Sequence, residues 1–212
     1  MRTELLPVPL APEISLHLAG GGTGLFDATG GEFRSDVPPP FWAFAWAGGQ
    51  ALARYVLDHP ETVAGRRVLD VACGSGVAAI AAARAGAATV EALDLDPAAA
   101  EAAERNAAAN GVTVRTRAAD ISDAGPADVI LAGDVFYTRS VAGTMTAALR
   151  RAAGSSGLIL VGDPGRGYFP ERLFVRRAQY TVPVPAALEE TDALATGVWE
   201  MRNTMHSSTN KL

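Results

Sequence analysis

The stretch from Val68 to Ile80, VLDVACGSGVAAI, constrains the fold more than any other part of the chain. Its apolar start predicts a buried strand, its glycines a tight turn, and its alanine-rich end a helix. A helix that begins directly after such a turn points its free amides at a bound ligand. We therefore expect the first strand–turn–helix unit of an α/β fold, with a ligand at the turn.

The next predicted strand ends in an acidic residue. The run TVEALDLDP places Asp94 eighteen residues beyond Gly76. A carboxylate at that strand tip is placed to accept hydrogen bonds from both hydroxyls of a ribose. The turn and Asp94 together predict a ribose-containing cofactor, and we include Leu95 in its site. Asp96, before Pro97, is predicted to cap the following helix.

The residues of the glycine turn favour S-adenosylmethionine over a dinucleotide. A dinucleotide turn uses three glycines, but alanine occupies the first and third positions here, at Ala72 and Ala78. Asp70 would repel a pyrophosphate, whereas it can pair with an ammonium group. S-adenosylmethionine carries an ammonium, a sulfonium and no phosphate. We predict that Asp70, Ala72, Gly74 and Gly76 bind it; the alternative for Asp70 and for Asp94 is a turn cap.

Charge and composition exclude several classes of function. The net charge is −5 with no basic tract, which disfavours nucleic-acid binding. Lys211 is the only lysine, so a phosphate-binding GxxxxGK loop and an internal Schiff base are absent. The three histidines lack metal-ligand spacing, so we expect no metal. No apolar run has the length of a membrane span, and we expect no signal peptide, because prolines and charges interrupt the start MRTELLPVPLAPE.

The single cysteine, Cys73, allows no intrachain disulfide. This fits a reducing compartment, and we expect a cytoplasmic protein. Cys73 itself is predicted to be a small filler in the turn. We expect a monomer.

Strands alternate with helices along the chain, which predicts a parallel sheet. We expect one domain over residues 41–203, an N-terminal extension over 1–40 packed on the core, and a disordered tail over 204–212. Residues 12–19 are predicted to form a short strand or helix, and 20–33 a turn or hairpin. The predicted helices are 49–58, 76–86, 97–110 and 139–153. The predicted strands are 67–71, 89–94, 112–117, one within 127–137, one within 157–166, 177–183 and 196–202.

Aspartates follow the predicted strands at the edge where such sheets bind ligands. Besides Asp70 and Asp94, these are Asp120 and Asp134. Asp120 is placed to accept from the exocyclic amine of adenine while Ile121 covers the ring. The alternative for Asp120 is a helix or turn cap.

The loop GDVFY after the fourth strand is the expected meeting point of the methyl acceptor and the sulfonium. It lacks the Asn/Asp-Pro-Pro-aromatic motif of nucleic-acid amino methyltransferases. Asp134 can orient an amine and receive its proton, and the rings of Phe136 and Tyr137 can hold a cation. Core packing is the alternative for Phe136.

Aromatic residues precede the first core helix. Trp42, Phe44 and Trp46 are placed to roof an apolar acceptor channel. An aromatic core cluster is the alternative.

The chain resembles the class I, seven-strand methyltransferases. It is similar in particular to the lysine methyltransferases of the electron transfer flavoprotein β subunit, from about Pro12 to about Arg202. The motifs that carry the likeness are FWAFAWAGGQALARYVLDHP, LDVACGSG, LDLDP, GDVFY and GDPGR. The resemblance implies a Rossmann-like, mostly parallel sheet with an antiparallel C-terminal hairpin and helices on both faces.

The resemblance also implies roles for individual residues. Asp70, Gly74, Asp94 and Trp46 would contact the cofactor, and Asp134 and Tyr137 would act on the acceptor side. Arg166 becomes a candidate substrate contact, although GDPGR alone predicts a β-turn. The family usually has glycine where Ala72 stands and proline where Ala47 stands.

Four functions remain in competition. The leading one is a protein lysine N-methyltransferase acting on the electron transfer flavoprotein β subunit, or on ribosomal proteins, with S-adenosylhomocysteine as product. The others are a small-molecule N-methyltransferase of the nicotinamide type, a non-catalytic cofactor-binding module and an NAD-dependent reductase. Asp70 opposes the last of these.

Overall fold

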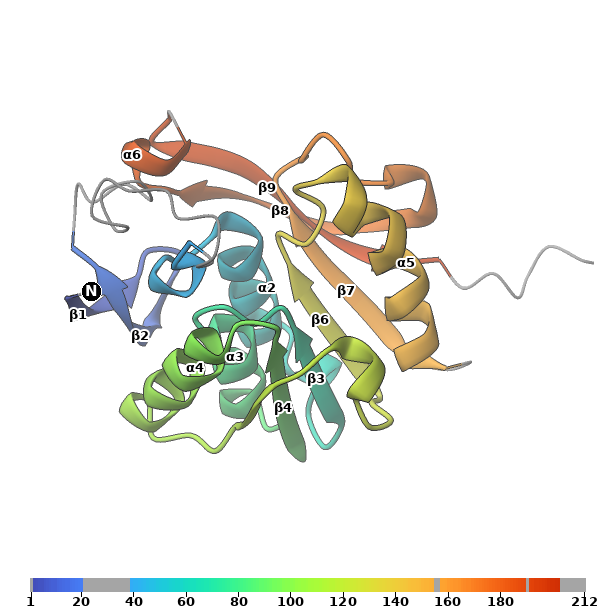
Figure 1. Ribbon diagram of the computed structural model, residues 1–212, viewed down its shortest axis with the longest axis horizontal. Coiled ribbons are helices and arrows are strands. Elements are labelled where there is room, and N and C mark those ends of the chain that lie inside the picture. The colour runs from blue at the N-terminus through green and yellow to red at the C-terminus, as the bar shows by residue number, and fades with distance from the viewer. Residues whose placement is uncertain (1, 21–38, 155–156, 190, 203–212) are drawn as a thin grey trace, which may run out of the picture.

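The computed structural model describes residues 2–20, 39–154, 157–189 and 191–202. A seven-stranded sheet with the order β5-β4-β3-β6-β7-β9-β8 forms its centre (Figure 1). The pairs are parallel from β5 to β7, and β9 is antiparallel to both β7 and β8. This confirms the predicted mostly parallel sheet with an antiparallel C-terminal hairpin. The strands are β3 Arg67–Val71, β4 Thr89–Asp94, β5 Arg115–Ala118, β6 Val129–Gly133, β7 Leu158–Asp163, β8 Phe174–Pro183 and β9 Ala193–Met201.

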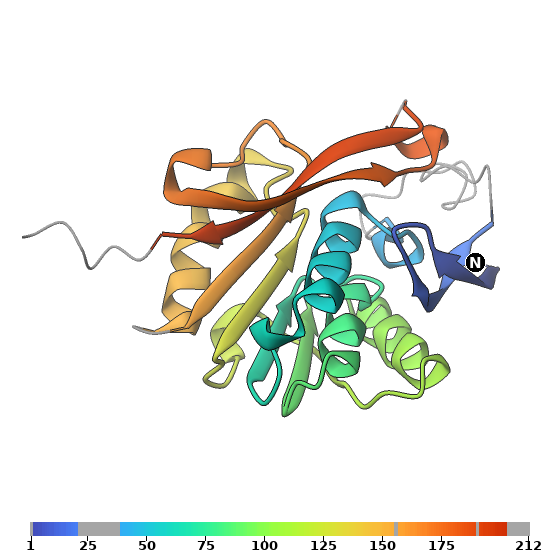
Figure 2. The same cartoon turned by 180° about the vertical axis from the view of Figure 1, so that it is seen from behind.

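Helices cover both faces of the sheet, as predicted (Figures 1 and 2). From β3 the chain moves outward through β4 to β5, while β6 and β7 lie on the other side of β3. Because parallel crossovers are right-handed, reversing the direction of travel moves the connecting helix to the opposite face. The helices α3 and α4 therefore share one face with α2, and α5 covers the other. Their bounds are α2 Ala47–Asp58, α3 Val77–Arg84, α4 Pro97–Ala109 and α5 Arg139–Ala153.

Each face of the sheet has its own apolar core. Neighbouring strand residues point to opposite faces, so Val68 packs with the α2–α4 layer and Leu69 with the α5 layer. Because both faces are covered, the central strands are almost continuously apolar. This explains why β3, β4 and β6 can be located from the sequence.

Most element boundaries agree with the predictions to within a few residues. The third strand begins at Arg115 rather than 112, because the Val112 amide still binds the Ala107 carbonyl at the end of α4. Gly111, directly after the C-cap residue Asn110, ends α4 with a left-handed φ of +67°. The predicted turn over 20–33 and the predicted tail lie almost wholly outside the described residues.

The N-terminal hairpin is the largest departure from the sequence predictions. β1, Thr3–Val8, is absent from them, and it pairs with β2, Ala11–Ala19, in a separate two-stranded sheet. Pro7 lies at a register shift in this pair and interrupts the alternating pattern by which a strand is recognised. The short helix α6, Ala186–Glu189, at the tip of the β8–β9 hairpin was also not predicted.

Asn106 of α4 and Asn110, the C-cap residue of that helix, attach the N-terminal hairpin to the core. The Asn106 Oδ1 accepts from the His17 amide at 2.8 Å, while its Nδ2 donates to the Ser75 carbonyl at 2.8 Å. Asn110 binds both backbone groups of Ser15. Asn106 thereby links β2 directly to the glycine turn after β3.

Candidate active site

The cleft lies at the topological switch point of the sheet, between the carboxyl ends of the neighbouring strands β3 and β6. The loops that follow these two strands diverge to opposite faces and leave a crevice, which is where open α/β sheets bind ligands. The cleft has a volume of about 40 Å³. Its lining residues are Trp46, Gly49, Asp70, Ala72, Cys73, Gly74, Ser75, Val77, Ala78, Gly133 and Asp134.

Asp70 lies at the base of this cleft and is almost fully buried. Its Oδ2 accepts from the Ala79 amide in the first turn of α3 at 3.0 Å. The cap weighed as an alternative is therefore present, and the same carboxylate also lines the cleft. Burial raises the pKa of Asp70 to about 7, although the Ala79 amide works in the opposite direction. A cation bound beside Asp70 would favour its charged form.

The turn after β3 has a left-handed backbone at three positions. Ala72, Gly74 and Gly76 have φ values of +53°, +51° and +78°. A Cβ on Gly76 would also lie 2.9 Å from the Cβ of Ala103, so glycine allows α4 to pack closely on the turn. Ala72 adopts the same region without being a glycine, which carries backbone strain. Cys73 is buried here, as a filler would be, and burial raises the pKa of its thiol.

Asp94 faces the glycine turn from the end of β4. Its Oδ2 accepts from the Gly74 amide at 2.9 Å and its Oδ1 from the Asp96 amide at 3.0 Å. Each carboxylate oxygen has a second lone pair, so both remain able to accept from ribose hydroxyls. Burial raises the pKa of Asp94, against the opposing effect of these amides. Asp96 itself caps α4 by accepting from the Ala98 amide, as predicted.

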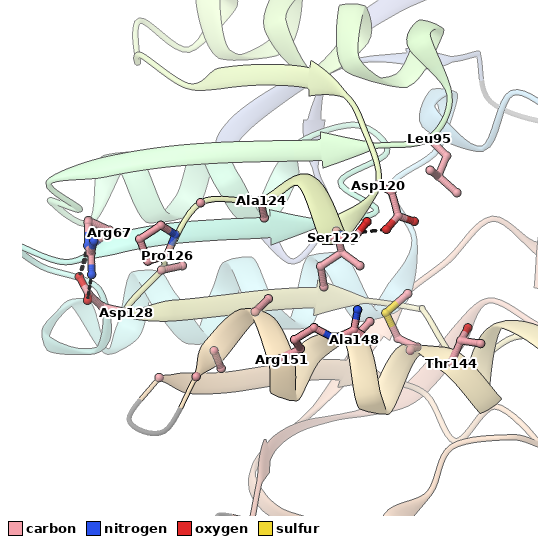
Figure 3. Close-up of a pocket in the computed structure, with 18 of the residues that line it drawn as sticks. Arg67, Leu95, Asp120, Ser122, Ala124, Pro126, Asp128, Thr144, Ala148 and Arg151 are labelled. Atoms are coloured by element: carbon pink, nitrogen blue, oxygen red, sulfur yellow. Dashed lines mark hydrogen bonds and ion pairs between the residues drawn. The ribbon is translucent and has the colours of Figure 1, made fainter.

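Three of the residues predicted to bind the cofactor lie together on a larger groove (Figure 3). Leu95, Asp120 and Ile121 line its end at the strand tips, and Leu95 is 74% exposed. The groove has a volume of about 1150 Å³ and runs beside α5. It is open because the β5–β6 connection contains only the 3₁₀ turn η3, Ile121–Asp123. Asp120 caps that turn by accepting from the Ser122 amide at 2.8 Å, so the alternative cap is present.

These groups fit S-adenosylmethionine. The buried carboxyl group of Asp70 is available for the ammonium group, and the carboxylate of Asp94 for the ribose. The exposed Leu95 and the carboxylate of Asp120 match an adenine ring and its amine. No group of three or more potential metal ligands occurs within the described ranges.

Asp134 follows β6 on the other side of the cleft. Its Oδ2 accepts from the Gly48 amide at 2.6 Å and the Gly49 amide at 3.2 Å, and its Oδ1 from Arg166 Nη2 at 3.2 Å. Burial raises the pKa of Asp134 to about 6, and the Arg166 guanidinium limits this rise. Both oxygens are thus held in place, on a backbone with a φ of +54°.

Three glycines bring the start of α2 onto the strand tips. A Cβ on Gly48 would collide with the Gly162 carbonyl and with Asp134, and a Cβ on Gly133 would lie 2.8 Å from the Gly49 nitrogen. Only residues without a side chain permit this approach. The close contact delivers the α2 amides to the Asp134 carboxylate.

Aromatic side chains lie near Asp134 at the surface. Tyr137 is 53% exposed and Phe41 is 41% exposed, and their ring centroids are 6.3 Å apart. Trp46, which lines the cleft, lies 5.9 Å from Phe41 by ring centroids and donates its Nε1–H to the Phe41 carbonyl at 2.7 Å. Phe41 was not predicted, although it begins the aromatic-rich run FWAFAW, which was the available signal.

Phe136 and Trp42, both predicted to contact the substrate, are not among the residues that line the cleft. The ring of Phe136 is fully buried and packs edge-on against Phe169 and Phe174 in the α5-side core. The substrate role proposed for Phe136 is therefore replaced by the core role, because a buried ring does not meet a substrate. Trp42 lies beside α4, where the Arg105 guanidinium sits 5.8 Å from its ring centroid. Phe44 is buried next to Trp46.

The end of β7 and the loop that follows it bring further charged residues close to Asp134. The prediction based on aspartates at strand ends did not include them. Asp163 accepts from the amides of Gly165 and Arg166, both at 2.7 Å, so GDPGR forms the predicted turn. Burial raises the pKa of Asp163. Arg166 points inward to Asp134 and Glu189, and Glu189 was not predicted at all.

The fold and site define a class I S-adenosylmethionine-dependent methyltransferase. Residues 50–136 match the family model of the ribosomal protein L11 methyltransferase. The structure of a candidate RNA methyltransferase from Pyrococcus horikoshii aligns with a TM-score of 0.60 at 15% identity, over 85% of this chain and 97% of that one. The Synechocystis magnesium protoporphyrin IX methyltransferase, solved with S-adenosylmethionine, aligns with a TM-score of 0.51 at 16% identity, over 72% and 76% of the two chains.

Relatives at higher identity define the family. The electron transfer flavoprotein β subunit lysine methyltransferase of Danio rerio is 39% identical over 198 residues, which cover 90% of this chain and 76% of that protein. The Xenopus laevis protein of the same name is 37% identical over 93% and 82% of the two chains. The chain belongs to the electron transfer flavoprotein β subunit lysine methyltransferase family, and its cofactor is S-adenosylmethionine.

Proposed function

We propose that this enzyme methylates the ε-amino group of a lysine in the electron transfer flavoprotein β subunit. The observation that carries the proposal is the similarity to the Danio rerio enzyme of that name, which covers 90% of this chain and therefore includes the acceptor side. The surroundings of Asp134 support it, because a buried carboxylate and exposed aromatic rings adjoin the cofactor cleft.

The chain's own residues bind and orient the reactants. S-adenosylmethionine supplies an electrophilic methyl group on a sulfonium. Asp70 pairs with its ammonium and Asp94 binds its ribose, while Tyr137 and Phe41 flank the incoming lysine side chain. Alignment of two reactants in a water-poor cleft supplies roughly 7–11 kcal/mol of barrier lowering.

Asp134 orients the acceptor amine by its charge. An amine attacks only when neutral, and an ordinary lysine has a pKa of about 10.4. Burial raises the pKa of Asp134 only to about 6, so the carboxylate is too weak a base to hold the lysine proton. Loss of solvent around the lysine favours its neutral form, and the proton leaves to water. We therefore assign Asp134 orientation of the amine rather than storage of its proton.

Ribosomal proteins are the second candidate substrates, because the L11 methyltransferase model matches residues 50–136. That match spans the cofactor half and stops before the β8–β9 hairpin, so it carries less information about the acceptor. For the small-molecule and non-catalytic alternatives we find no comparable observation.

Labelled S-adenosylmethionine tests the substrate. The purified enzyme is incubated with the purified electron transfer flavoprotein β subunit and, separately, with a methyltransferase-deficient lysate. We expect label on a lysine of the flavoprotein subunit and a single labelled lysate band of that size, both formed much more slowly by the Asp134→Asn enzyme. A band of ribosomal-protein size, label confined to small metabolites, or S-adenosylhomocysteine binding without transfer would each reject the proposed substrate.

We also propose a monomeric, cytoplasmic enzyme that binds neither membranes nor nucleic acids. The net charge of −5 without a basic tract and the single cysteine support this. None of the described helices combines the length and apolarity needed to cross a bilayer. We likewise propose the domain limits 1–40, 41–203 and 204–212.

A further inference from the structure

Arg166 bridges two carboxylates that come from distant parts of the chain. Its Nη2 lies 3.2 Å from Asp134 Oδ1, and its guanidinium holds Glu189 through two bonds, Nη1–Oε2 at 3.0 Å and Nη2–Oε1 at 2.6 Å. Glu189 belongs to α6, at the tip of the β8–β9 hairpin. The three side chains are largely shielded, with exposed fractions of 24% for Arg166, 12% for Asp134 and 11% for Glu189.

We propose that Arg166 and Glu189 are positioning residues, which hold the Asp134 carboxylate in its working orientation and link the tip of the β8–β9 hairpin to methyl transfer. The inference rests on the proposed function in one respect, namely that Asp134 faces the acceptor amine. It revises the role of Arg166, which was predicted to contact the substrate.

The bond lengths show where Arg166 is anchored. Both bonds to Glu189 are shorter than the 3.2 Å bond to Asp134. A two-bond contact between a guanidinium and a carboxylate fixes the plane of the guanidinium as well as its position. Glu189 therefore sets where the Arg166 guanidinium lies, and that guanidinium sets Asp134 Oδ1. A displacement of the hairpin tip would therefore move Glu189, then the Arg166 guanidinium, and through it the Asp134 carboxylate.

The two oxygens of the Asp134 carboxylate are held by different groups, and only the bond from Oδ1 to Arg166 depends on a side chain. Oδ2 is fixed by the Gly48 and Gly49 amides, which belong to the rigid start of α2. Oδ1 accepts a hydrogen bond from Arg166 only, as far as the described residues show. Without the guanidinium, Asp134 would keep its burial but lose the positive charge that offsets it.

The charges around Asp134 come from β7, its following loop and α6. Asp163 and Glu189 are negative and Arg166 is positive. Asp163 also binds the backbone amide of Arg166, which fixes the base of that side chain. The Oδ2 of Asp163 and the Nε of Arg166 are buried and have no hydrogen-bond partner in the described structure. Among the described residues, the Arg166 guanidinium forms ion pairs with Asp134 and Glu189, and its charge also lowers the pKa of Asp163 against the effect of burial.

Carboxyl NMR tests the inference without any acceptor. The ¹³C-carboxyl signal of Asp134, assigned from its loss in Asp134→Asn, is followed as a function of pH. Arg166→Met should raise the pKa of Asp134 by roughly one pH unit or more, as expected when a neighbouring opposite charge is removed. The matched control is Arg177→Met, which breaks an arginine–glutamate pair with Glu200 on the same hairpin and should leave the Asp134 signal unchanged. An unchanged pKa in Arg166→Met would overturn the inference.

A double-mutant cycle tests the positioning role in turnover. Arg166→Met should lower kcat on the order of 100-fold, with Arg166→Lys intermediate, and leave the Kd for S-adenosylhomocysteine within about twofold. Glu189→Gln should cause a smaller loss, because Arg166 then keeps Asp134 but loses its anchor. In the Asp134→Asn background, Arg166→Met should cause no further decrease in kcat. A second decrease in kcat as large as that in the wild-type background would overturn the inference.

The two proposals fail separately. If the wild type does not label the flavoprotein subunit, the substrate proposal fails, and the titration of Asp134 still decides the positioning role. If Arg166→Met does not fold, as judged by thermal unfolding, Arg166→Lys decides, because it keeps a charge but not the two-bond contact. An Arg166→Lys enzyme with wild-type kcat and an unshifted Asp134 titration would contradict the inference.

Discussion

Individual residues of the cofactor turn carry strain that the fold tolerates. Ala72 has a φ of +53°, and its side chain is exposed, so no packing contact explains an alanine there. A Cβ in this left-handed region costs about 1–2 kcal/mol. Asp134 shares the feature, with a φ of +54°, but its carboxylate is engaged on both oxygens. The strained backbone at Asp134 therefore accompanies a carboxylate that is held on both oxygens, whereas nothing in the structure explains Ala72.

We predict that Ala72→Gly raises the free energy of unfolding by about 0–1 kcal/mol. The relief of strain is partly offset by the greater freedom of glycine in the unfolded chain. Chemical denaturation measures the change. Ala147→Gly, at an exposed position of α5, is the matched control and should lower stability by about 1 kcal/mol. Equal losses in both variants would contradict the strain at Ala72.

Asp70 is predicted to make cofactor binding depend on pH. Burial raises the pKa of Asp70 from 3.8 to about 7 in the folded protein. Its contribution to stability is therefore complete below about pH 4 and is lost as the pH rises through 7. Pairing with the ammonium group of the ligand requires the charged form of Asp70, so S-adenosylhomocysteine affinity should fall below pH 7, and binding near pH 7 should release a proton.

Calorimetry in buffers of different ionisation enthalpy counts that proton. Asp70→Asn keeps an acceptor for the Ala79 amide but removes the charge. It should weaken S-adenosylhomocysteine binding and abolish the part of the proton release that Asp70 supplies. Heats that do not depend on the buffer in the wild type would count against the raised pKa.

Secondary-structure elements could be located from the sequence where one local rule dominates. The strands β3, β4 and β6 are apolar because both faces of the sheet are covered, and Asp96 and Pro97 mark the start of α4. The strand-tip aspartates follow from the common edge of a parallel sheet. Phe41 and Glu189 could not be found in this way, because their roles depend on contacts across the fold. Glu189 meets Arg166 only through the β8–β9 hairpin.

The hydrogen bonds of Asn106 between α4, the N-terminal hairpin and the cofactor turn should contribute to both stability and cofactor binding. Asn106→Ala removes bonds to both the Ser75 carbonyl and the His17 amide, in a fully buried place. We expect a loss of about 2–3 kcal/mol in unfolding free energy, since each abandoned buried partner costs about 1–3 kcal/mol. S-adenosylhomocysteine should also bind more weakly, because Ser75 belongs to the cofactor turn.

Asn110→Ala is the matched control for Asn106→Ala. It removes bonds to Ser15 of β2 but none to the cofactor turn. Denaturation should show a loss of stability, while calorimetry should show unchanged S-adenosylhomocysteine affinity. Equal effects of the two variants on affinity would mean that the whole hairpin, rather than the Asn106–Ser75 bond, supports the turn.

Across the whole molecule, the site is assembled from five elements. The cofactor side comes from β3 and β4, the proposed acceptor side from β6 and β7, and α2 joins them at the point where the strand order reverses. Gly48, Gly133 and Gly162 allow that junction, because each would place a Cβ on the backbone of a neighbouring element. The sequence shows these glycines, but their purpose follows only from the packing of α2 on the strand tips.

Gly48→Ala should therefore disturb stability and catalysis together. The added methyl group meets the Gly162 carbonyl and the Asp134 carboxylate, so α2 must shift away from both. Overpacking of this kind costs about 1–3 kcal/mol in unfolding free energy. The shift withdraws the amides that hold Asp134 Oδ2, and we expect kcat to fall on the order of 100-fold. Gly143→Ala places the same methyl group in α5 with no atom within 4 Å, and should instead add about 1 kcal/mol of stability without changing kcat. Denaturation and methyl-transfer kinetics on both variants separate the two cases, and a Gly48→Ala enzyme with wild-type kcat would show that Asp134 does not depend on the start of α2.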